Sequence, residues 1–225
     1  MSSNFHADGT LFIVSGPSGA GKTTLINRVR EQLEPLGLPL YFSVSHTTRA
    51  PRAGEEHGKN YYFVTLAEFA RMVDAGEFLE HAHVHEQRYG TSKQEVVSRL
   101  QRGEDVILDI DYQGAKQIAN DRDLKDRSLS VFIFPPSLEA LQQRLRVRHL
   151  NTENEIQTRL QKAIGEIDAG KDFYDYIIIN DNLDIAAECL KSAIIARKLK
   201  TKTALEQINK MAERFREEER NGRIT

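Results

Sequence analysis

A single short motif near the start of the chain restricts the folds that this sequence can adopt. Residues 16–23 read G-P-S-G-A-G-K-T and match the pattern G-x-x-x-x-G-K-[ST] in full. The motif follows an apolar run at 11–14, which predicts a buried strand, and precedes a helical pattern over 22–32. Glycines let such a loop curl so that its N–H groups face phosphate oxygens, and the helix N-terminus adds its dipole. The motif therefore predicts a nucleoside triphosphate site in a strand–loop–helix unit.

The residue types within this loop assign contacts to a bound triphosphate. Lys22 would bridge the β- and γ-phosphates, and the Thr23 hydroxyl would bind Mg²⁺. The other expected ATP contacts lie along the loop and the first helical turn, at Gly16, Pro17, Ser18, Gly19, Ala20, Gly21 and Thr24. A glycine-rich turn without chemical meaning is the alternative, and the predicted strand and helix on either side argue against it.

Apolar runs alternate with helical patterns along the rest of the chain. Continuous apolar runs at 106–108 and 129–134 are typical of parallel strands covered on both faces, and 176–179 predicts the last such strand. This alternation indicates an α/β fold, a P-loop unit with a mostly parallel doubly wound sheet. The 225 residues are enough for one domain of this kind.

The alternation also suggests how that one domain is divided. We place the core at about 10–45 and 92–200, and an inserted region that breaks the alternation at about 46–91. The segment from about 198 to 225 is rich in Lys, Arg and Glu, which predicts a solvated helical extension. A contact in a homo-oligomer is a second role that this extension could have.

Composition and charge narrow the functional classes. Lys and Arg total 31 against 33 Asp and Glu, so the formal charge of -2 gives no general attraction to nucleic acid or membrane. Cys189 is the only cysteine, which excludes an internal disulfide and fits a reducing compartment. No apolar run approaches the roughly 20 residues of a membrane helix, and the first nine residues lack the features of a signal peptide. We therefore expect a cytoplasmic protein.

Two further groups of charged residues follow predicted strands. Arg49 and Arg52 lie three residues apart in a loop, and their guanidinium groups suit bidentate capture of a phosphate. A solvated charged loop explains the same pattern on composition alone. Asp109 and Asp111 end the apolar strand that begins at 105, where ligands gather in α/β sheets. Asp109 would then help to hold Mg²⁺, or the two acids would cap the next helix.

A third charged group lies on two predicted helices in the C-terminal half of the chain. Arg144 and Arg148 stand at i and i+4 on one helical face, and Arg159 follows in the next helix. Phosphoryl transfer spreads negative charge over the migrating group, which mobile guanidinium groups can stabilise. A basic solvent face paired with nearby glutamates is the alternative, and it stays open for Arg146.

Taken together, these segments resemble the guanylate kinases. The string S-x-S-x-T-T-R-x-x-R-x-G-E at 43–55 is similar to the GMP-binding signature of that family. Further matches are G-K-N-Y at 58–61, F-L-E at 78–80, Y-G-T at 89–91 and L-D-I-D-x-Q-G at 108–114. With the phosphate loop and the arginine segment, the resemblance covers about residues 11–180. It implies a kinase that transfers the γ-phosphate of ATP to GMP with Mg²⁺, with an inserted GMP-binding region and a helical lid at about 140–160.

The resemblance also assigns roles to individual residues. It places the GMP phosphate on Arg49, Arg52, Tyr61 and Tyr89, the guanine on Ser45, Glu80, Thr91 and Asp111, and Glu55 and Asp109 in the same GMP-binding set. Independently, the N1–H and N2–H₂ donors of guanine suit carboxylates, whereas adenine presents an acceptor at N1 and would be repelled.

The remaining assignments concern the catalytic cations and the ATP base. The catalytic set implied by the resemblance is Lys22, Arg49, Arg144, Arg148 and Arg159, and Asn180 resembles the family residue near the adenine. His149 departs from the family, which usually has glycine after the last arginine of this helix.

Two other functions stay open from the sequence. Guanylate-kinase-like domains of scaffold proteins use the GMP cleft to bind phosphoproteins, but those domains usually have a degraded phosphate loop, whereas this loop is complete. A related P-loop kinase acting on another phosphorylated acceptor is the second alternative. The paired acids Glu80 and Asp111 argue against it.

Overall fold

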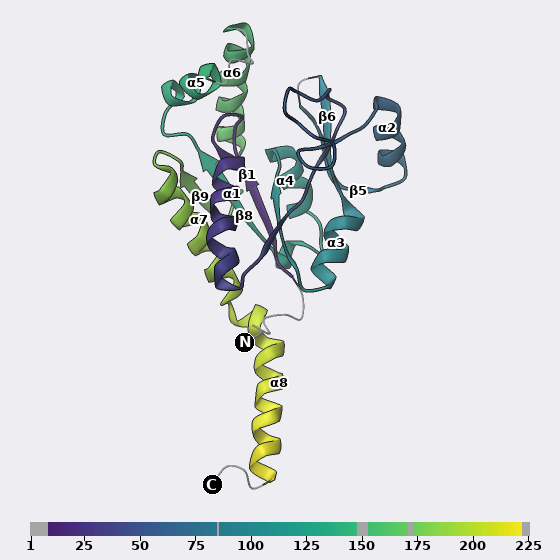
Figure 1. Ribbon diagram of the computed structural model, residues 1–225, viewed down its shortest axis with the longest axis vertical. Helices are drawn as coiled ribbons and strands as arrows, with labels where there is room; N and C mark the ends of the chain where they lie inside the picture. Colours follow the sequence, from purple (N-terminus) through teal and green to yellow (C-terminus); the bar gives the residue numbers. More distant parts are fainter. Residues whose placement is uncertain (1–8, 85, 148–152, 171–172, 222–225) are drawn as a thin grey trace.

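The central element of the protein is a five-stranded sheet in which every strand pair is parallel. The computed structural model describes residues 9–84, 86–147, 153–170 and 173–221. Within them the strand order of this sheet is β2-β7-β1-β8-β9 (Figure 1). The strands are β1 Leu11–Ser15, β2 Leu40–Phe42, β7 Asp105–Asp109, β8 Ser128–Phe134 and β9 Tyr176–Ile179. Since Val14 of β1 pairs with Asp109 of β7, the end of β7 lies next to the start of the phosphate loop.

Helices cover both faces of this sheet, which explains the continuous apolar runs in its strands. The covering helices are α1 Lys22–Leu33, α3 Lys93–Gln101, α4 Tyr112–Ala119 and α7 Leu183–Lys198. Leu25 of α1 and Leu190 of α7 pack in one buried cluster on one face, whereas Leu100 of α3 and Ile118 of α4 pack on the other. The doubly wound α/β architecture expected from the sequence is therefore confirmed.

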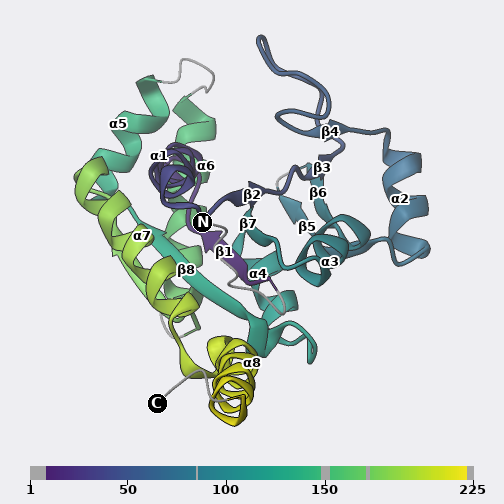
Figure 2. The same cartoon turned by 60° about the horizontal axis from the view of Figure 1, so that its bottom comes forward.

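A second, smaller sheet is built from residues 46–92, where the alternation of strands and helices is broken. Its order is β4-β3-β6-β5, with β3 His46–Thr47, β4 Tyr62–Phe63, β5 Phe78–Val84 and β6 Gln87–Ser92. Helix α2 (Leu66–Asp74) packs on it through Phe69 and Met72, which contact Phe78. This sheet and α2 lie on one side of the molecule, facing α5 (Leu138–Val147) and α6 (Glu153–Gly170) on the other (Figures 1 and 2).

Helices α5 and α6 form a small unit of their own. Leu141 and Leu145 of α5 pack against Ile156 and Ala163 of α6. Two 3-10 turns lie in other connections: η1 (Glu34–Leu36) follows α1, and η2 (Lys125–Arg127) precedes β8. The expectations for Arg148 and His149 fall outside the described residues.

The C-terminal end of the folded body lies where the two predicted segments overlap, the core to about 200 and the extension from about 198. Lys198 belongs to the body, because its side chain is buried and its ammonium donates a hydrogen bond to the Asp105 carboxylate. Asp105 also accepts a hydrogen bond from the backbone N–H of Thr10 at 2.9 Å. Composition alone does not reveal that a buried acid, 93 residues earlier in the chain, pairs with this lysine. Helix α8 (Thr201–Arg220) projects from the body (Figure 1).

Replacing Lys198 with alanine is expected to lower the free energy of unfolding by about 3–5 kcal/mol, because it leaves the Asp105 carboxylate buried without its counter-ion. Chemical denaturation of the purified protein measures this change. Arg28→Ala is the matched control, since it breaks an exposed pair with Asp184 and should cost about 1 kcal/mol or less. Equal losses in the two variants would contradict the prediction.

None of the helices within the described residues has the length and the apolar character needed to cross a lipid bilayer.

Candidate active site

The loop between β1 and α1 has the backbone geometry of an anion-binding cradle. Gly16, Gly19 and Gly21 have φ angles of 143°, 94° and 88°, in the region that favours glycine. A Cβ atom on Gly16 would lie 2.3 Å from the carbonyl oxygen of Ile133, so a side chain does not fit there. Gly21 caps α1 without a side-chain hydrogen bond to the first turn. The first N–H groups of α1 can therefore bind the oxygens of a phosphate.

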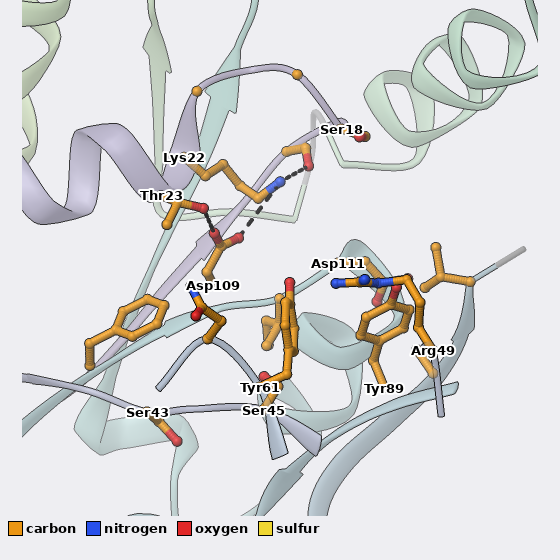
Figure 3. A pocket seen from close by; sticks show the side chains of 18 of the residues that line it. Ser18, Lys22, Thr23, Ser43, Ser45, Arg49, Tyr61, Tyr89, Asp109 and Asp111 are labelled. Atoms are coloured by element: carbon orange, nitrogen blue, oxygen red, sulfur yellow. Dashed lines mark hydrogen bonds and ion pairs between the residues drawn. The ribbon is translucent and has the colours of Figure 1, made fainter. Parts of the chain in front are cut away.

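Lys22, Thr23 and Asp109 meet beside this loop, at the carboxyl ends of β1 and β7. The Lys22 ammonium donates a hydrogen bond to the Gly16 carbonyl at 2.7 Å and lies 3.7 Å from the Asp109 carboxylate. The Thr23 hydroxyl donates to the other carboxylate oxygen of Asp109 at 2.7 Å (Figure 3). A hydroxyl and a carboxylate are the oxygen ligands that Mg²⁺ prefers, and triphosphate oxygens usually complete its shell. The residues present therefore fit a magnesium ion bound together with a nucleotide.

A second cationic group faces the loop from the smaller sheet. Figure 3 shows Arg49, Tyr61 and Tyr89 across the cavity from Lys22 and Thr23. The Arg49 guanidinium lies over the Tyr61 ring, 5.3 Å from its centroid, and the rings of Tyr61 and Tyr89 are 5.9 Å apart. Burial raises the pKa of Tyr61 to about 12, so its hydroxyl stays protonated and can donate a hydrogen bond. The group thus offers a cation and a phenolic donor to an anion.

Glu55 bonds to both arginines of the loop at 49–52. Its carboxylate accepts a hydrogen bond from Arg49 at 2.9 Å and another from the backbone N–H of Arg52 at 2.8 Å. The hydrogen bond from Arg49 lowers the pKa of Glu55, which keeps it ionised. Glu55 lines the cavity, but these contacts indicate that it orients the arginines.

Two carboxylates lie at the far end of the cavity from the phosphate loop. Glu80 of β5 is only 3% exposed and accepts a hydrogen bond from the Thr91 hydroxyl at 2.5 Å. Burial is the main cause that raises the pKa of Glu80 to about 7. Asp111 is the N-cap of α4 and accepts a hydrogen bond from the Gly114 N–H at 3.0 Å. The capping interpretation of the two acids is therefore correct for Asp111, whereas Asp109 bonds to Thr23 instead.

The sequence analysis gave no role to Gly114 beyond its place in the L-D-I-D-x-Q-G match. A Cβ atom there would lie 2.2 Å from a Glu80 carboxylate oxygen, so α4 can approach β5 this closely only at a glycine. A glycine three residues after an acidic helix cap was the available signal, but it does not reveal which side chain packs against it.

Of the lid arginines in the described part of the chain, Arg159 contacts the phosphate loop directly, and Arg144 contacts Asn180, which bonds to the loop. The Arg159 guanidinium donates a hydrogen bond to the Ser18 hydroxyl at 2.8 Å. Arg144 donates to the backbone carbonyl of Asn180 at 2.8 Å, and the Asn180 amide donates to the Ala20 carbonyl at 2.8 Å. Asn180 is buried, and it fixes the conformation of the loop.

A cavity of about 680 Å³ connects these groups, within the usual size of small-molecule sites. Most of the residues expected from the sequence line it: Gly16, Ser18, Gly19, Gly21, Lys22, Thr23, Ser45, Arg49, Arg52, Glu55, Tyr61, Glu80, Tyr89, Asp109, Asp111 and Arg159. The others with described positions are not part of this lining: Pro17, Ala20, Thr24, Thr91, Arg144 and Asn180. Thr91 reaches it indirectly, through its hydrogen bond to Glu80.

Among the lining residues that the sequence analysis did not assign to the site, two charged ones lie on the same helix as Arg159. Lys162 and Glu166 lie on α6, three and seven positions after Arg159, and both line the cavity. Burial raises the pKa of Glu166. The spacing i, i+3, i+7 places all three side chains on one helical face, and this pattern was the signal available in the sequence.

The fold and the site together define a class of protein. A parallel sheet carries a complete G-x-x-x-x-G-K-T loop at its carboxyl edge, a neighbouring strand ends in an acid, and arginine-bearing helices lie over the loop. These are the parts of a P-loop phosphotransferase, in which positioned cations stabilise a migrating phosphate.

Comparison with known proteins identifies the family. The sequence profile of the guanylate kinase family matches residues 8–197. A guanylate kinase of Hahella chejuensis is 47% identical over 194 residues, 86% of this chain and 89% of the relative, and one of Geobacter metallireducens is 45% identical over 208 residues, 92% and 97% of the two chains. The crystal structure of guanylate kinase from Anaplasma phagocytophilum, 32% identical, superimposes with a TM-score of 0.68 and covers 88% of this chain and 90% of that one.

The chain therefore belongs to the guanylate kinase family. The high identity over most of the chain supports catalytic guanylate kinase activity and the enzyme class predicted from the sequence, a nucleoside monophosphate kinase. Membership implies ATP and GMP as substrates, in a reaction that generally requires Mg²⁺.

Proposed function

We propose that ATP binds at the loop between β1 and α1, that GMP binds against the smaller sheet, and that the γ-phosphate passes between them across the cavity. The observation that carries this proposal is the pair of facing groups in one cavity, Lys22 with Asp109 on one side and Arg49 with Tyr61 on the other. The single cysteine supports a cytoplasmic setting for this reaction.

On the ATP side, the chain supplies charge and oxygen ligands. Lys22 leaves its contact with Gly16 and binds the β- and γ-phosphates, whose oxygens also accept hydrogen bonds from the loop N–H groups. Thr23 and Asp109 would hold Mg²⁺, which would supply positive charge at the transferred phosphate. Asn180 acts on the nucleotide through the loop, because its amide holds the Ala20 carbonyl.

On the GMP side, the chain positions a nucleophile that needs no general base. The second pKa of a phosphate monoester is about 6, so GMP is mostly a dianion at neutral pH and its oxygen can attack directly. Arg49, Arg52, Tyr61 and Tyr89 bind this phosphate and aim it at the γ-phosphate. Arg144, Arg148 and Arg159 stabilise the charge that develops as the lid closes and excludes water.

The carboxylates of Glu80 and Asp111 select guanine. Each carboxylate would accept hydrogen bonds from the N1–H and N2–H₂ groups of a guanine bound in the cavity. Adenine has a hydrogen-bond acceptor at N1 instead, which the carboxylates would repel. The Thr91 hydroxyl orients Glu80, and Ser45 completes the base contacts from the start of the GMP-binding loop.

The raised pKa of Glu80 predicts a pH dependence of GMP binding. Only the ionised carboxylate accepts both guanine donors, so GMP binding requires a proton to leave Glu80 when the pH is below its pKa of about 7. The dissociation constant for GMP should rise roughly tenfold per pH unit below 7, since protons and GMP then compete. Calorimetric titration with GMP, repeated about every pH unit between about pH 5 and 8, measures this dissociation constant.

The GMP phosphate also titrates in this range, and the Glu80→Gln variant separates the two effects. The variant should retain only the weaker dependence that belongs to the phosphate. If the variant and the unmodified protein have the same pH profile, Glu80 does not titrate as proposed.

A coupled assay of ADP release with ATP, Mg²⁺ and each of GMP, AMP, CMP and UMP tests the whole proposal. We expect turnover with GMP alone. Turnover with another monophosphate in place of GMP would make the protein a different P-loop kinase. If folded protein binds GMP but releases no ADP with any of the four, the phosphoprotein-binding module would be favoured instead.

A further inference from the structure

Glu166 is an acidic residue in the wall of the cavity that the proposed reaction does not use. It lies on α6, about two helical turns after Arg159 and about one turn after Lys162, and all three side chains line the cavity. The structure describes the whole of α6, and of the acidic residues in this helix, at 153, 155, 166 and 168, Glu166 is the one that lines the cavity. Its carboxylate is therefore within reach of a bound ligand.

The surroundings of Glu166 place it near both ends of the proposed GMP site. Burial is the largest influence on the pKa of Glu166 and raises it, and the charges of Lys22, Asp111 and Lys162 also act on this group. Helix α6 contacts α4, whose N-cap is Asp111. Since Lys22 belongs to the phosphate loop and Asp111 to the proposed guanine end, Glu166 lies close to the part of the cavity between phosphate and base.

The carboxylate of Glu166 is available as a hydrogen-bond acceptor. The other acids that line the cavity each accept a hydrogen bond from the protein: Glu55 from Arg49, Glu80 from Thr91, Asp109 from Thr23 and Asp111 from Gly114. Among the described residues, no hydrogen bond or ion pair occupies Glu166. A half-buried carboxylate gains stability when a donor from a ligand completes its hydrogen bonding.

The hydrogen-bond donors of GMP decide which of its groups Glu166 can bind. The phosphate of GMP presents acceptors and negative charge, which a carboxylate repels. The guanine N1–H and N2–H₂ donors belong to Glu80 and Asp111 in the proposed function. The ribose hydroxyls are the donors that remain, and a carboxylate is a common partner for the 2′-hydroxyl of a bound ribose.

The shape of the nucleotide indicates which side of it carries this hydroxyl. In double helices, the guanine N2–H₂ group and the ribose 2′-hydroxyl lie along the same minor-groove edge. An acid beside the N2–H₂ acceptor, and displaced from it toward the phosphate loop, is therefore on the side of the 2′-hydroxyl. Glu166 has this position relative to Asp111 and Lys22.

We infer that the Glu166 carboxylate accepts a hydrogen bond from the 2′-hydroxyl of GMP and makes the protein select GMP over its 2′-deoxy analogue, dGMP. The inference rests on the proposed function, because it uses the orientation of GMP given there. Glu166 then determines the sugar specificity of the site, whereas Glu80 and Asp111 determine the base specificity.

Steady-state turnover with GMP and with dGMP, at saturating ATP and Mg²⁺, tests this inference. The unmodified protein should prefer GMP by about 10–100-fold in kcat/KM, the range expected for one hydrogen bond to a charged group. Glu166→Ala should reduce this preference to about twofold or less, because neither nucleotide then meets an acceptor at the 2′ position. Glu166→Gln keeps a neutral acceptor of similar shape, so its preference should lie between these values.

Two controls separate a contact with the GMP ribose from other roles of Glu166. Asp168→Asn removes a carboxylate from an exposed position of the same helix, outside the cavity lining, and should keep the preference of the unmodified protein. The preference for ATP over dATP should be equal in all variants, because the inference assigns Glu166 to the acceptor nucleotide.

Equal use of GMP and dGMP by the unmodified protein would overturn the inference, as would Glu166 variants that keep its full preference. Variants that lose activity with both nucleotides in the same ratio would also overturn it, and would make Glu166 a counter-ion of Lys22. A changed preference between ATP and dATP would move Glu166 to the donor ribose. All these results leave the turnover of GMP by the unmodified protein intact, whereas a lack of that turnover would contradict the proposed function itself.

Discussion

Replacing Lys22 with alanine is expected to lower kcat by about 10²–10³-fold while the domain stays folded. The Lys22 ammonium lies between the Gly16 carbonyl and the Asp109 carboxylate, beside the loop that would hold the β- and γ-phosphates. Its absence leaves the developing charge of the transferred phosphate without its nearest fixed cation. Steady-state assays with saturating ATP and GMP measure the change.

The fold should survive this change because Lys22 contributes little to the core. Its side chain contacts a carbonyl and a carboxylate at the edge of the cavity, whereas the neighbouring Leu25 and Ile26 hold α1 on the sheet. Lys191→Ala, on the outer surface of α7, is the control for loss of a lysine and should keep full activity. Near-normal turnover of Lys22→Ala would remove Lys22 from the proposed mechanism.

Much of this site could be predicted from the sequence because its chemistry depends on local motifs. A phosphate loop is one continuous segment, and the position of Lys22 and Thr23 follows from the strand before it and the helix after it. The same holds for Asp109, since the ends of parallel strands meet at one edge of the sheet.

The features that could not be predicted depend on contacts between distant segments. Lys198 is buried because Asp105 lies beneath it, and no local pattern connects the two. Glu55 holds Arg49 through the fold of its own loop, which a signature of residue types does not describe. Gly114 is needed because Glu80 comes from another element and occupies the space beside it.

Asn180 illustrates the difference between proximity and contact. The resemblance placed it near the adenine. In the structure its side-chain amide donates a hydrogen bond to the phosphate loop, and its backbone carbonyl accepts one from Arg144. In the proposed function, Asn180 would therefore act on ATP through the conformation of residues 16–24. A resemblance between sequences cannot distinguish a direct contact with a ligand from a supporting one.

Replacing Glu80 with glutamine or Asp111 with asparagine is expected to weaken the preference for GMP over AMP by about 10–100-fold in each case. Each amide removes a charged acceptor for a guanine donor, a hydrogen bond of about 1.5–3 kcal/mol. The amide also ends the repulsion of the adenine N1 acceptor, so kcat/KM for AMP should rise while that for GMP falls. The ratio of the two kcat/KM values is the measurement.

Both substitutions are designed to leave the structure intact, so that selectivity is the property that changes. Glutamine at position 80 can still accept the hydrogen bond from Thr91, and asparagine at position 111 caps a helix as well as aspartate does. Glu77→Gln, an exposed change near the start of β5, is the control for loss of one negative charge. If both amide variants lose activity with GMP and AMP in equal proportion, the carboxylates support the site without reading the base, and the selectivity must come from elsewhere in the cavity.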